Sequence, residues 1–274
     1  MSDGERRLIV NADDLGLHAR IDAGILRSHR DGIVTSASIS PNGASFVEAA
    51  AAARASGLPV GIHLTLVGEA PVSAPEAVPS LAPAGRLPPG YRDLFRRLLL
   101  GRVRRPELER ELEAQVARAR DAGLEITHLD SHQHVHLHPA LLPLTLALAR
   151  RFGIPAVRAA PWVWPVDGIR TLTVALLMRR AAGCARREGL RVPDMAMGIA
   201  ETGGLREERL VQILEHLSAG TSVLVCHPGS ADAEIDAAYG WHFHWDDETR
   251  ALTSPAVREI LRRRTIQLID YRDI

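Results

Sequence analysis

The chain has 274 residues, 46% of them hydrophobic and 24% charged, and its 33 basic and 33 acidic side chains cancel to a formal net charge of zero. This length is enough for one large domain with its own core, and the charge balance gives no sign of a basic face for nucleic acid. All 33 basic residues are arginine, so the lack of lysine excludes Schiff-base chemistry, a P-loop lysine and a Ser–Lys nucleophile pair.

Short β-rich segments alternate with helical patterns along nearly the whole chain. In chain order we expect strand 8–11, helix 20–30, strand 33–39, helix 45–55, strand 60–66, helix 106–122, strand 126–130, helix 139–151, strand 156–158, helix 171–188, strand 195–199, helix 207–217, strand 222–226, helix 255–263 and strand 266–269. Roughly eight such steps predict an α/β fold, a single-domain irregular (β/α) barrel similar to a TIM barrel over residues 1–274. A doubly wound open sheet is the alternative.

One long connection interrupts this alternation. Residues 67–90 contain six prolines and three glycines, and the whole stretch 67–105 is expected to be a loop or helical excursion near the active site. Connections longer than about 15 residues more often form a lid or a subsite wall than a simple link. In the helix that follows, Glu107, Glu109, Glu111 and Glu113 come early and Arg118 and Arg120 late, the order that suits the helix dipole.

Cysteine usage and hydropathy limit the cellular context. Cys184 and Cys226 lie far apart, which is not the spacing of a disulfide framework, a zinc ribbon or a thioredoxin-type motif. The N-terminal segment has no apolar stretch typical of a signal peptide. The longest apolar runs are about half the ~20 residues that a membrane span needs. We therefore expect a cytoplasmic protein without a membrane span.

Polar side chains follow the expected strands at the points where the strands end. These residues are Asp13 and Asp14, His63, Asp130 and His132, Arg158, and His227. In (β/α) barrels the catalytic groups come from the C-terminal ends of several strands. The sequence therefore predicts an active site at that end of the barrel.

The densest signal is the histidine run from His128 to His138. It holds five of the twelve histidines of the chain, and every even position is His or Asp. If the segment is extended, these imidazoles and the Asp130 carboxylate share one face. Imidazole nitrogen with carboxylate oxygen is typical of catalytic Zn²⁺, Ni²⁺, Fe²⁺ or Co²⁺ sites. The alternative is a polar loop whose histidines cap a helix and bond to backbone, and the spacing alone does not say which histidine binds a metal.

The other polar residues also allow two interpretations each. Asp13 and Asp14 would point to opposite sides of a strand, so one could hold a metal and the other move protons, or they form a turn before the next helix. His63 is either a metal ligand or a hydrogen-bonded core residue. His227 is either an acid or base or part of a turn. Arg158 either orients a carboxylate or pairs with one structurally.

Several segments together resemble the YdjC-like carbohydrate deacetylase family, which includes chitooligosaccharide deacetylases. They are LIVNADDLGL, GIVTSASI, GIHLTLVGEAPV, THLDSHQHVHLHP, VLVCHPG and the terminal YRDI. The resemblance runs in order from residue 8 to residue 274. Leu15 stands where Phe is usual, His18 where Ser is frequent, and Gln133 where some members have histidine. The 67–105 excursion matches poorly, which leaves the identity of the substrate open.

The resemblance implies an irregular (β/α) barrel that removes the acetyl group from N-acetylated sugars with one divalent metal ion. It implies Asp14, His63 and His132 as the metal ligands and Asp13 as the catalytic base. The family metal is usually given as Mg²⁺, whereas two histidines and one carboxylate suit Zn²⁺, Co²⁺ or Ni²⁺ better. Family members are often homodimers, so a homodimer is possible here.

The expected mechanism is hydrolysis of an acetamide by metal-activated water. Asp13 would take the water proton, and Arg158 would orient Asp13. His227 is the first candidate to protonate the departing amine, with His134 or His136 as second choice, and Asp130 would bind substrate or support the ligands. The same residues also suit a hydrolase of a non-sugar amide or ester, a metal-dependent aldolase or isomerase, or a non-catalytic sugar- or metal-binding module.

Overall fold

The computed structural model describes residues 4–274, and its strands form one sheet in which every pairing is parallel. The strands are β1 (Arg6–Leu15), β2 (Ser36–Ile39), β3 (Val60–Leu64), β4 (Ile126–Ser131), β5 (Ala156–Val157), β6 (Trp162–Val163), β7 (Met195–Met197), β8 (Gly220–Cys226) and β9 (Ile266–Ile269). The helices are α1 (Ala19–Arg30), α2 (Phe46–Ser56), α3 (Tyr91–Leu99), α4 (Arg105–Asp121), α5 (Leu142–Arg151), α6 (Ile169–Arg187), α7 (Glu207–Glu215), α8 (Ala233–Tyr239), α9 (Trp245–Thr253) and α10 (Pro255–Arg263), with 3₁₀ turns η1 (Pro75–Ala77) and η2 (His132–Leu137).

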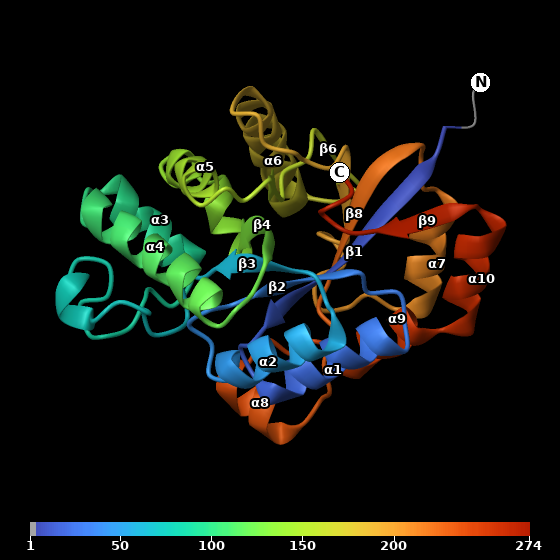
Figure 1. The fold of residues 1–274 in the computed structure, drawn as a ribbon, viewed down its shortest axis with the longest axis horizontal. Helices are drawn as coiled ribbons and strands as arrows, with labels where there is room; N and C mark the ends of the chain where they lie inside the picture. Colours follow the sequence, from blue (N-terminus) through green and yellow to red (C-terminus); the bar gives the residue numbers. More distant parts are fainter. Residues whose placement is uncertain (1–3) are drawn as a thin grey trace.

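The strand order identifies the sheet as an irregular barrel. It runs β5-β4-β3-β2-β1-β8-β7-β6, which is the order around a closed barrel opened between β5 and β6. In a doubly wound sheet, the strand next to β1 on this side would come from the middle of the chain, whereas here it is β8, from near the end of the chain. Across the open seam, a single bridge joins Ala156 to Arg191. Helices surround the sheet, with α3 and α4 on the side opposite α7 and α10 (Figure 1), so the predicted fold class is confirmed.

Strand β1 is the centre of this sheet. Its run Leu8, Ile9 and Val10 is fully buried, as expected for a parallel strand covered on both faces. It pairs with β8 along Arg6–Ala12. On its other edge, β9 pairs with the first half of the strand and β2 with the second half. β1 is thus paired on both edges as far as Ala12, and beyond this residue it pairs with β2 alone, at Leu15.

The two aspartates lie inside β1 and not in a turn after it. The register with β2 shifts between Ala12 and Leu15, which marks a bulge, and Asp14 has a left-handed φ of 72°. A bulge changes the direction in which side chains point, so Asp13 and Asp14 do not alternate across the sheet as we predicted. They do not cap the next helix either, because His18 is the N-cap of α1.

The excursion is held by buried carboxylates of α4. Glu111 accepts hydrogen bonds from the backbone nitrogens of Val72 and Ser73, both at 2.9 Å. Glu107, one helical turn earlier, accepts the backbone N–H of Ser80 at 2.6 Å. Both side chains are buried, so their main role is to fix a proline-rich segment that has little regular structure of its own. The sequence analysis related these glutamates only to the helix dipole and did not predict that they hold the excursion.

Several boundaries differ from the prediction for local reasons. Helix α5 begins at Leu142 and not at residue 139, because Pro143 has no N–H and fits only in the first turn. The short elements α3, β6, α8 and α9 were not predicted. Within residues 4–274, no helix is long and apolar enough to cross a membrane.

We expect Glu111→Ala to lower the free energy of unfolding by about 1–3 kcal/mol, because two part-buried N–H groups lose their acceptor. Hydrogen exchange at Val72 and Ser73 should become faster, and urea unfolding measures the stability. Glu113→Ala is the matched control, because Glu113 lies on the same helix but forms only an exposed ion pair with Arg151. Equal protection of the Val72 and Ser73 amides in both variants would contradict this role of Glu111.

Candidate metal centre and active site

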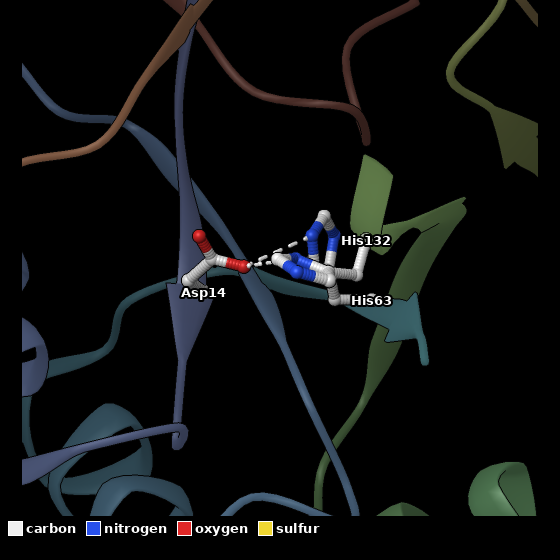
Figure 2. A group of neighbouring side chains, drawn as sticks. All are labelled: Asp14, His63 and His132. Atoms are coloured by element: carbon white, nitrogen blue, oxygen red, sulfur yellow. Dashed lines mark hydrogen bonds and ion pairs between the residues drawn. The ribbon is translucent and has the colours of Figure 1, made fainter. Parts of the chain in front are cut away.

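Three side chains from three strand ends converge at the C-terminal edge of the barrel. Asp14 comes from the bulge of β1, His63 from β3, and His132 directly follows β4 (Figure 2). The Asp14 Oδ1 atom lies 3.3 Å from His63 Nε2 and 2.9 Å from His132 Nδ1. One oxygen and two nitrogens at such distances can hold a metal ion.

Strand register orients His63. His63 pairs with Asp130 across β3 and β4, so the two side chains lie next to each other on one face. The Asp130 Oδ1 atom is 2.7 Å from His63 Nδ1, which leaves Nε2 directed at Asp14. A carboxylate behind a histidine in this way fixes the tautomer and orientation of a metal ligand. Asp130 therefore supports the cluster through His63.

The histidine run is not extended beyond β4, which corrects our prediction of one shared face. The chain turns into η2, and Gln133 and His134 adopt left-handed φ values of 53° and 55°. Both ring nitrogens of His136 are engaged, by the Ser131 hydroxyl at 2.6 Å and the Arg158 carbonyl at 2.9 Å. Burial lowers the pKa of His136 to about 4. His136 is therefore a structural residue.

The other histidines of the run lie in different environments. His128 is buried and stacks on Tyr271, with the ring centroids 3.7 Å apart. It occupies the space over Gly61, where a Cβ atom would lie 2.3 Å from the His128 ring. His134 is half-buried, its Nδ1 atom has no partner within residues 4–274, and burial lowers its pKa well below the usual range. Only His132 of this run joins the Asp14–His63 cluster.

Asp13 lies beside this cluster and is clamped by Arg158. The Arg158 Nη1 and Nη2 atoms lie 2.5 and 2.8 Å from the two Asp13 oxygens, and Nη1 also lies 3.1 Å from Asp130. Asp13 Oδ2 is 3.9 Å from the same His63 nitrogen that faces Asp14. Asp13 and Asp14 therefore serve one site from one side, and Arg158, which is 0% exposed, orients Asp13.

The buried charges at this edge do not balance. Asp13, Asp14 and Asp130 are buried beside one guanidinium, that of Arg158, which contacts Asp13 and Asp130. Two negative charges are left uncompensated if the imidazoles are neutral. Burial alone would lower the pKa of His63, but Asp130 and Asp13 outweigh it and raise this pKa to about 10. Buried charges must be paired or must bind a metal. A divalent cation fits both the donor atoms and the missing charge.

His227 faces Asp13 from the end of β8. Its Nε2 atom is 4.0 Å from Asp13 Oδ2, and burial lowers its pKa. Its backbone nitrogen donates to Glu248 Oε2 at 2.6 Å, and the Leu205 nitrogen donates to the other oxygen at 3.3 Å. Glu248 is fully buried, and burial raises its pKa to about 8. Glu248 thus ties together the loops after β7 and β8.

Sequence reasoning missed Glu248. It lies in the acidic first turn of α9, a helix that was not predicted, and acidic residues at a helix start are usually exposed. Only the burial of Glu248 reveals its role, and no sequence pattern indicates that burial.

A cavity of about 710 Å³ opens beside the cluster. Its walls come from the excursion and the start of α3, from His132 and Gln133, and from residues 238–241. The excursion thus borders this cavity, and its place near an active site stays a prediction. Aromatic rings, prolines and a few charged side chains line this cavity, which is the composition of a ligand site.

The fold and the site together define a class: a (β/α) barrel with a buried Asp–His–His cluster and an adjacent carboxylate at the C-terminal edge of its strands. Residues 7–263 match the sequence model of the YdjC-like protein family. The chain belongs to this family.

Relatives with assigned names cover nearly the whole chain. A carbohydrate deacetylase of Brevibacillus brevis is 32% identical over 98% of this chain and 99% of its own length. A chitooligosaccharide deacetylase of Klebsiella pneumoniae is 33% identical over 98% of this chain and 100% of its own length. A solved structure from Enterococcus faecalis V583, described as a candidate cellobiose-phosphate cleavage protein, is 29% identical with a TM-score of 0.79 and covers 98% of both chains.

We expect Glu248→Gln to lower the free energy of unfolding by about 1–3 kcal/mol, because the amide group can no longer accept both backbone N–H groups. Urea unfolding measures this loss, and the exposed Glu208→Gln on α7 is the matched control. If both variants were equally stable, Glu248 would not hold the two loops.

Proposed function

We propose that this protein is a metal-dependent carbohydrate N-deacetylase that releases acetate from an N-acetylated sugar such as a chitooligosaccharide. The observation that carries the proposal is the Asp14–His63–His132 cluster with Asp13 clamped beside it, next to a cavity large enough for a sugar. The names of the relatives support the substrate class. A metal-dependent deacetylase would need both the uncompensated negative charge, which attracts the ion, and Asp13, the carboxylate outside the three candidate ligands.

Asp14, His63 and His132 would hold one divalent ion, with Asp130 orienting His63 from behind. When bound, the ion supplies Lewis-acid chemistry: it polarises the acetamide carbonyl and lowers the pKa of water toward neutrality. Mg²⁺ follows from the family resemblance, while the nitrogen ligands favour Zn²⁺, Co²⁺ or Ni²⁺.

Asp13 would act as the general base that removes the proton of the attacking water. Its two oxygens are held by Arg158, so the carboxylate is fixed in position before substrate binds. Arg158 is therefore a positioning residue in this proposal, and Asp13 is the catalytic one.

His227 would donate the proton that the departing sugar amine requires, because an amide anion cannot leave. Its Nε2 atom faces Asp13 from across the site. His136 is a poor alternative because both of its ring nitrogens are already bonded. His134 remains the second choice, because burial and Arg158 lower its pKa well below the usual range. For His227 the neighbouring Asp13 and Asp14 oppose the lowering of the pKa by burial.

Asp13→Asn should reduce turnover about 10²–10⁴-fold, the usual contribution of a general base, while the divalent ion stays bound. Acetate release measures the rate, and calorimetric titration with Zn²⁺ measures the metal. Asp121→Asn, an exposed change, is the control. Near-full activity of Asp13→Asn would remove Asp13 from the role of base.

Asp14→Ala, His63→Ala and His132→Ala should each lower metal affinity by at least about 10-fold, because each removes one of three ligands. Metal content after dialysis measures this loss, with the exposed His216→Ala as control. Full occupancy in any of the three would remove that residue from the ligand set.

Acetate release from N-acetylated chitooligosaccharides, with Mg²⁺, Zn²⁺, Co²⁺ or Ni²⁺ added singly to metal-stripped protein, tests the whole proposal. We expect release only with metal, because without it nothing polarises the acetamide carbonyl. No acetate with any metal, from protein that binds one, would contradict this substrate. Turnover of simple amides or esters would then indicate a different hydrolase, and sugar binding without turnover a binding module.

A further inference from the structure

Two buried side chains that the candidate site does not include connect two of its carboxylates. Asn11 lies on β1, two residues before Asp13, and Ser38 lies on the neighbouring strand β2. The Asn11 amide donates hydrogen bonds to Asp13 Oδ1 at 2.9 Å and to Ser38 Oγ at 2.8 Å. The Ser38 hydroxyl donates to Asp130 Oδ2 at 2.5 Å. Asn11 and Ser38 therefore form a hydrogen-bonded bridge between the two carboxylates.

The chemistry of these groups fixes the direction of every hydrogen bond in the bridge. Ionised carboxylates only accept, so the nitrogen and not the oxygen of the Asn11 amide must face Asp13. The Ser38 hydroxyl has one proton, which Asp130 accepts, so its oxygen is free to accept from Asn11. Both N–H bonds of the Asn11 amide are thus used, and neither side chain of the bridge can turn without losing a hydrogen bond.

Arg158 connects the same two carboxylate oxygens by a second path. Its Nη1 atom lies 2.5 Å from Asp13 Oδ1 and 3.1 Å from Asp130 Oδ2. The guanidinium and the Asn11–Ser38 bridge thus close a ring of hydrogen bonds around these two oxygens. Turning either carboxylate would break contacts on both paths, so the ring fixes the two groups relative to each other.

The ring leaves the other oxygen of each carboxylate directed at the candidate site. Asp13 Oδ2 lies 3.9 Å from His63 Nε2 and 4.0 Å from His227 Nε2. Asp130 Oδ1 lies 2.7 Å from His63 Nδ1. One set of hydrogen bonds therefore orients Asp13 directly and His63 through Asp130.

A glycine in β3 leaves room for side chains of β2 and β4 to meet. These two strands flank β3, and because adjacent strands are about 4.8 Å apart, short side chains on them are normally out of reach of each other. Ser38 pairs with Gly61 of β3. The ring of His128 fills the space over Gly61, where a Cβ atom would lie 2.3 Å from it, and His128 Nε2 lies 3.2 Å from Ser38 Oγ. Gly61 therefore allows Ser38 to reach β4.

We propose that Asn11 and Ser38 are positioning residues of the candidate site. Their bridge, together with Arg158, holds the two carboxylates in one arrangement, so that Asp13 and the candidate ligand His63 are oriented as a unit. The inference rests on the proposed function, in which Asp13 is the base and His63 holds the metal. It adds that loss of either bridge residue disturbs both roles, although neither residue is itself a candidate ligand or base.

A double-mutant cycle measured by calorimetry with Zn²⁺ tests this coupling without turnover. Ser38→Ala and Asn11→Ala should each weaken Zn²⁺ binding about 10-fold, because groups behind a metal ligand contribute at this level. The double variant should bind within about 3-fold of the weaker single variant, because the bridge is already broken. Effects that multiply to about 100-fold would show two independent residues and overturn the bridge.

Ser36→Ala is the matched control for this cycle. Ser36 is buried on the same strand as Ser38, and its hydroxyl has no hydrogen-bond partner within residues 4–274, so this variant should bind Zn²⁺ like the wild type. Urea unfolding shows whether each variant is folded. Asn11→Leu, which keeps the approximate volume and removes the amide, replaces Asn11→Ala if the latter does not fold. Wild-type Zn²⁺ affinity in folded Ser38→Ala would overturn the proposal by itself.

Acetate release gives the second readout. Both single variants should lower kcat at least about 10-fold with KM within about 2-fold of the wild type, because the base shifts while the cavity keeps its lining. A merely structural role would lower the free energy of unfolding and leave kcat of the folded variants unchanged. If no substrate yields acetate but the Zn²⁺ cycle behaves as expected, the deacetylase proposal fails and the coupled positioning stands. If the wild type releases acetate and Ser38→Ala keeps its kcat and Zn²⁺ affinity, the positioning role is wrong and the deacetylase proposal stands.

Discussion

The excess of negative charge at the top of the barrel is the constraint on which the rest of the site depends. Three buried carboxylates lie at this edge with one guanidinium, which contacts two of them, and transferring such charges from water is costly unless each is paired. Arg158 compensates Asp13 and part of Asp130, which leaves Asp14 with two imidazoles as its neighbours. In the proposed function, a divalent cation between Asp14, His63 and His132 would compensate the remaining negative charge. The same imbalance explains why the pKa of His63 rises despite burial.

Backbone geometry, more than side-chain packing, brings these groups together. The bulge in β1 turns two consecutive aspartates toward one site, and the left-handed Asp14 is a costly conformation for a residue with a side chain. The register of β3 against β4 places His63 beside Asp130. The bulge begins where the pairing with β8 ends, at Ala12, and β2 resumes its pairing with β1 at Leu15. The two aspartates therefore lie in the part of β1 that the regular ladders do not constrain.

Sequence analysis predicted those features whose signal lies within a short stretch of the chain. Alternating strand and helix patterns predicted the barrel, and polar residues at strand ends predicted the edge where Asp14, His63 and His132 meet, because parallel strands all end on one side. The extended histidine run was wrong, since two left-handed residues after His132 turn the chain away from the strand direction. Glu248 was missed because its role arises from contacts with loops about 20 and 43 residues away in sequence, which no periodic pattern records.

Buried acidic groups in this protein fall into two sets with different partners. Asp13, Asp14 and Asp130 at the barrel edge face imidazoles and a guanidinium, and they form the candidate site. Asp22, Glu107, Glu111 and Glu248 instead accept backbone N–H groups of loops, and they hold those loops in place. A carboxylate from a helix can fix a proline-rich segment that forms no sheet or helix of its own. It follows that the position of the excursion depends on helix carboxylates that take no part in the Asp14–His63–His132 cluster.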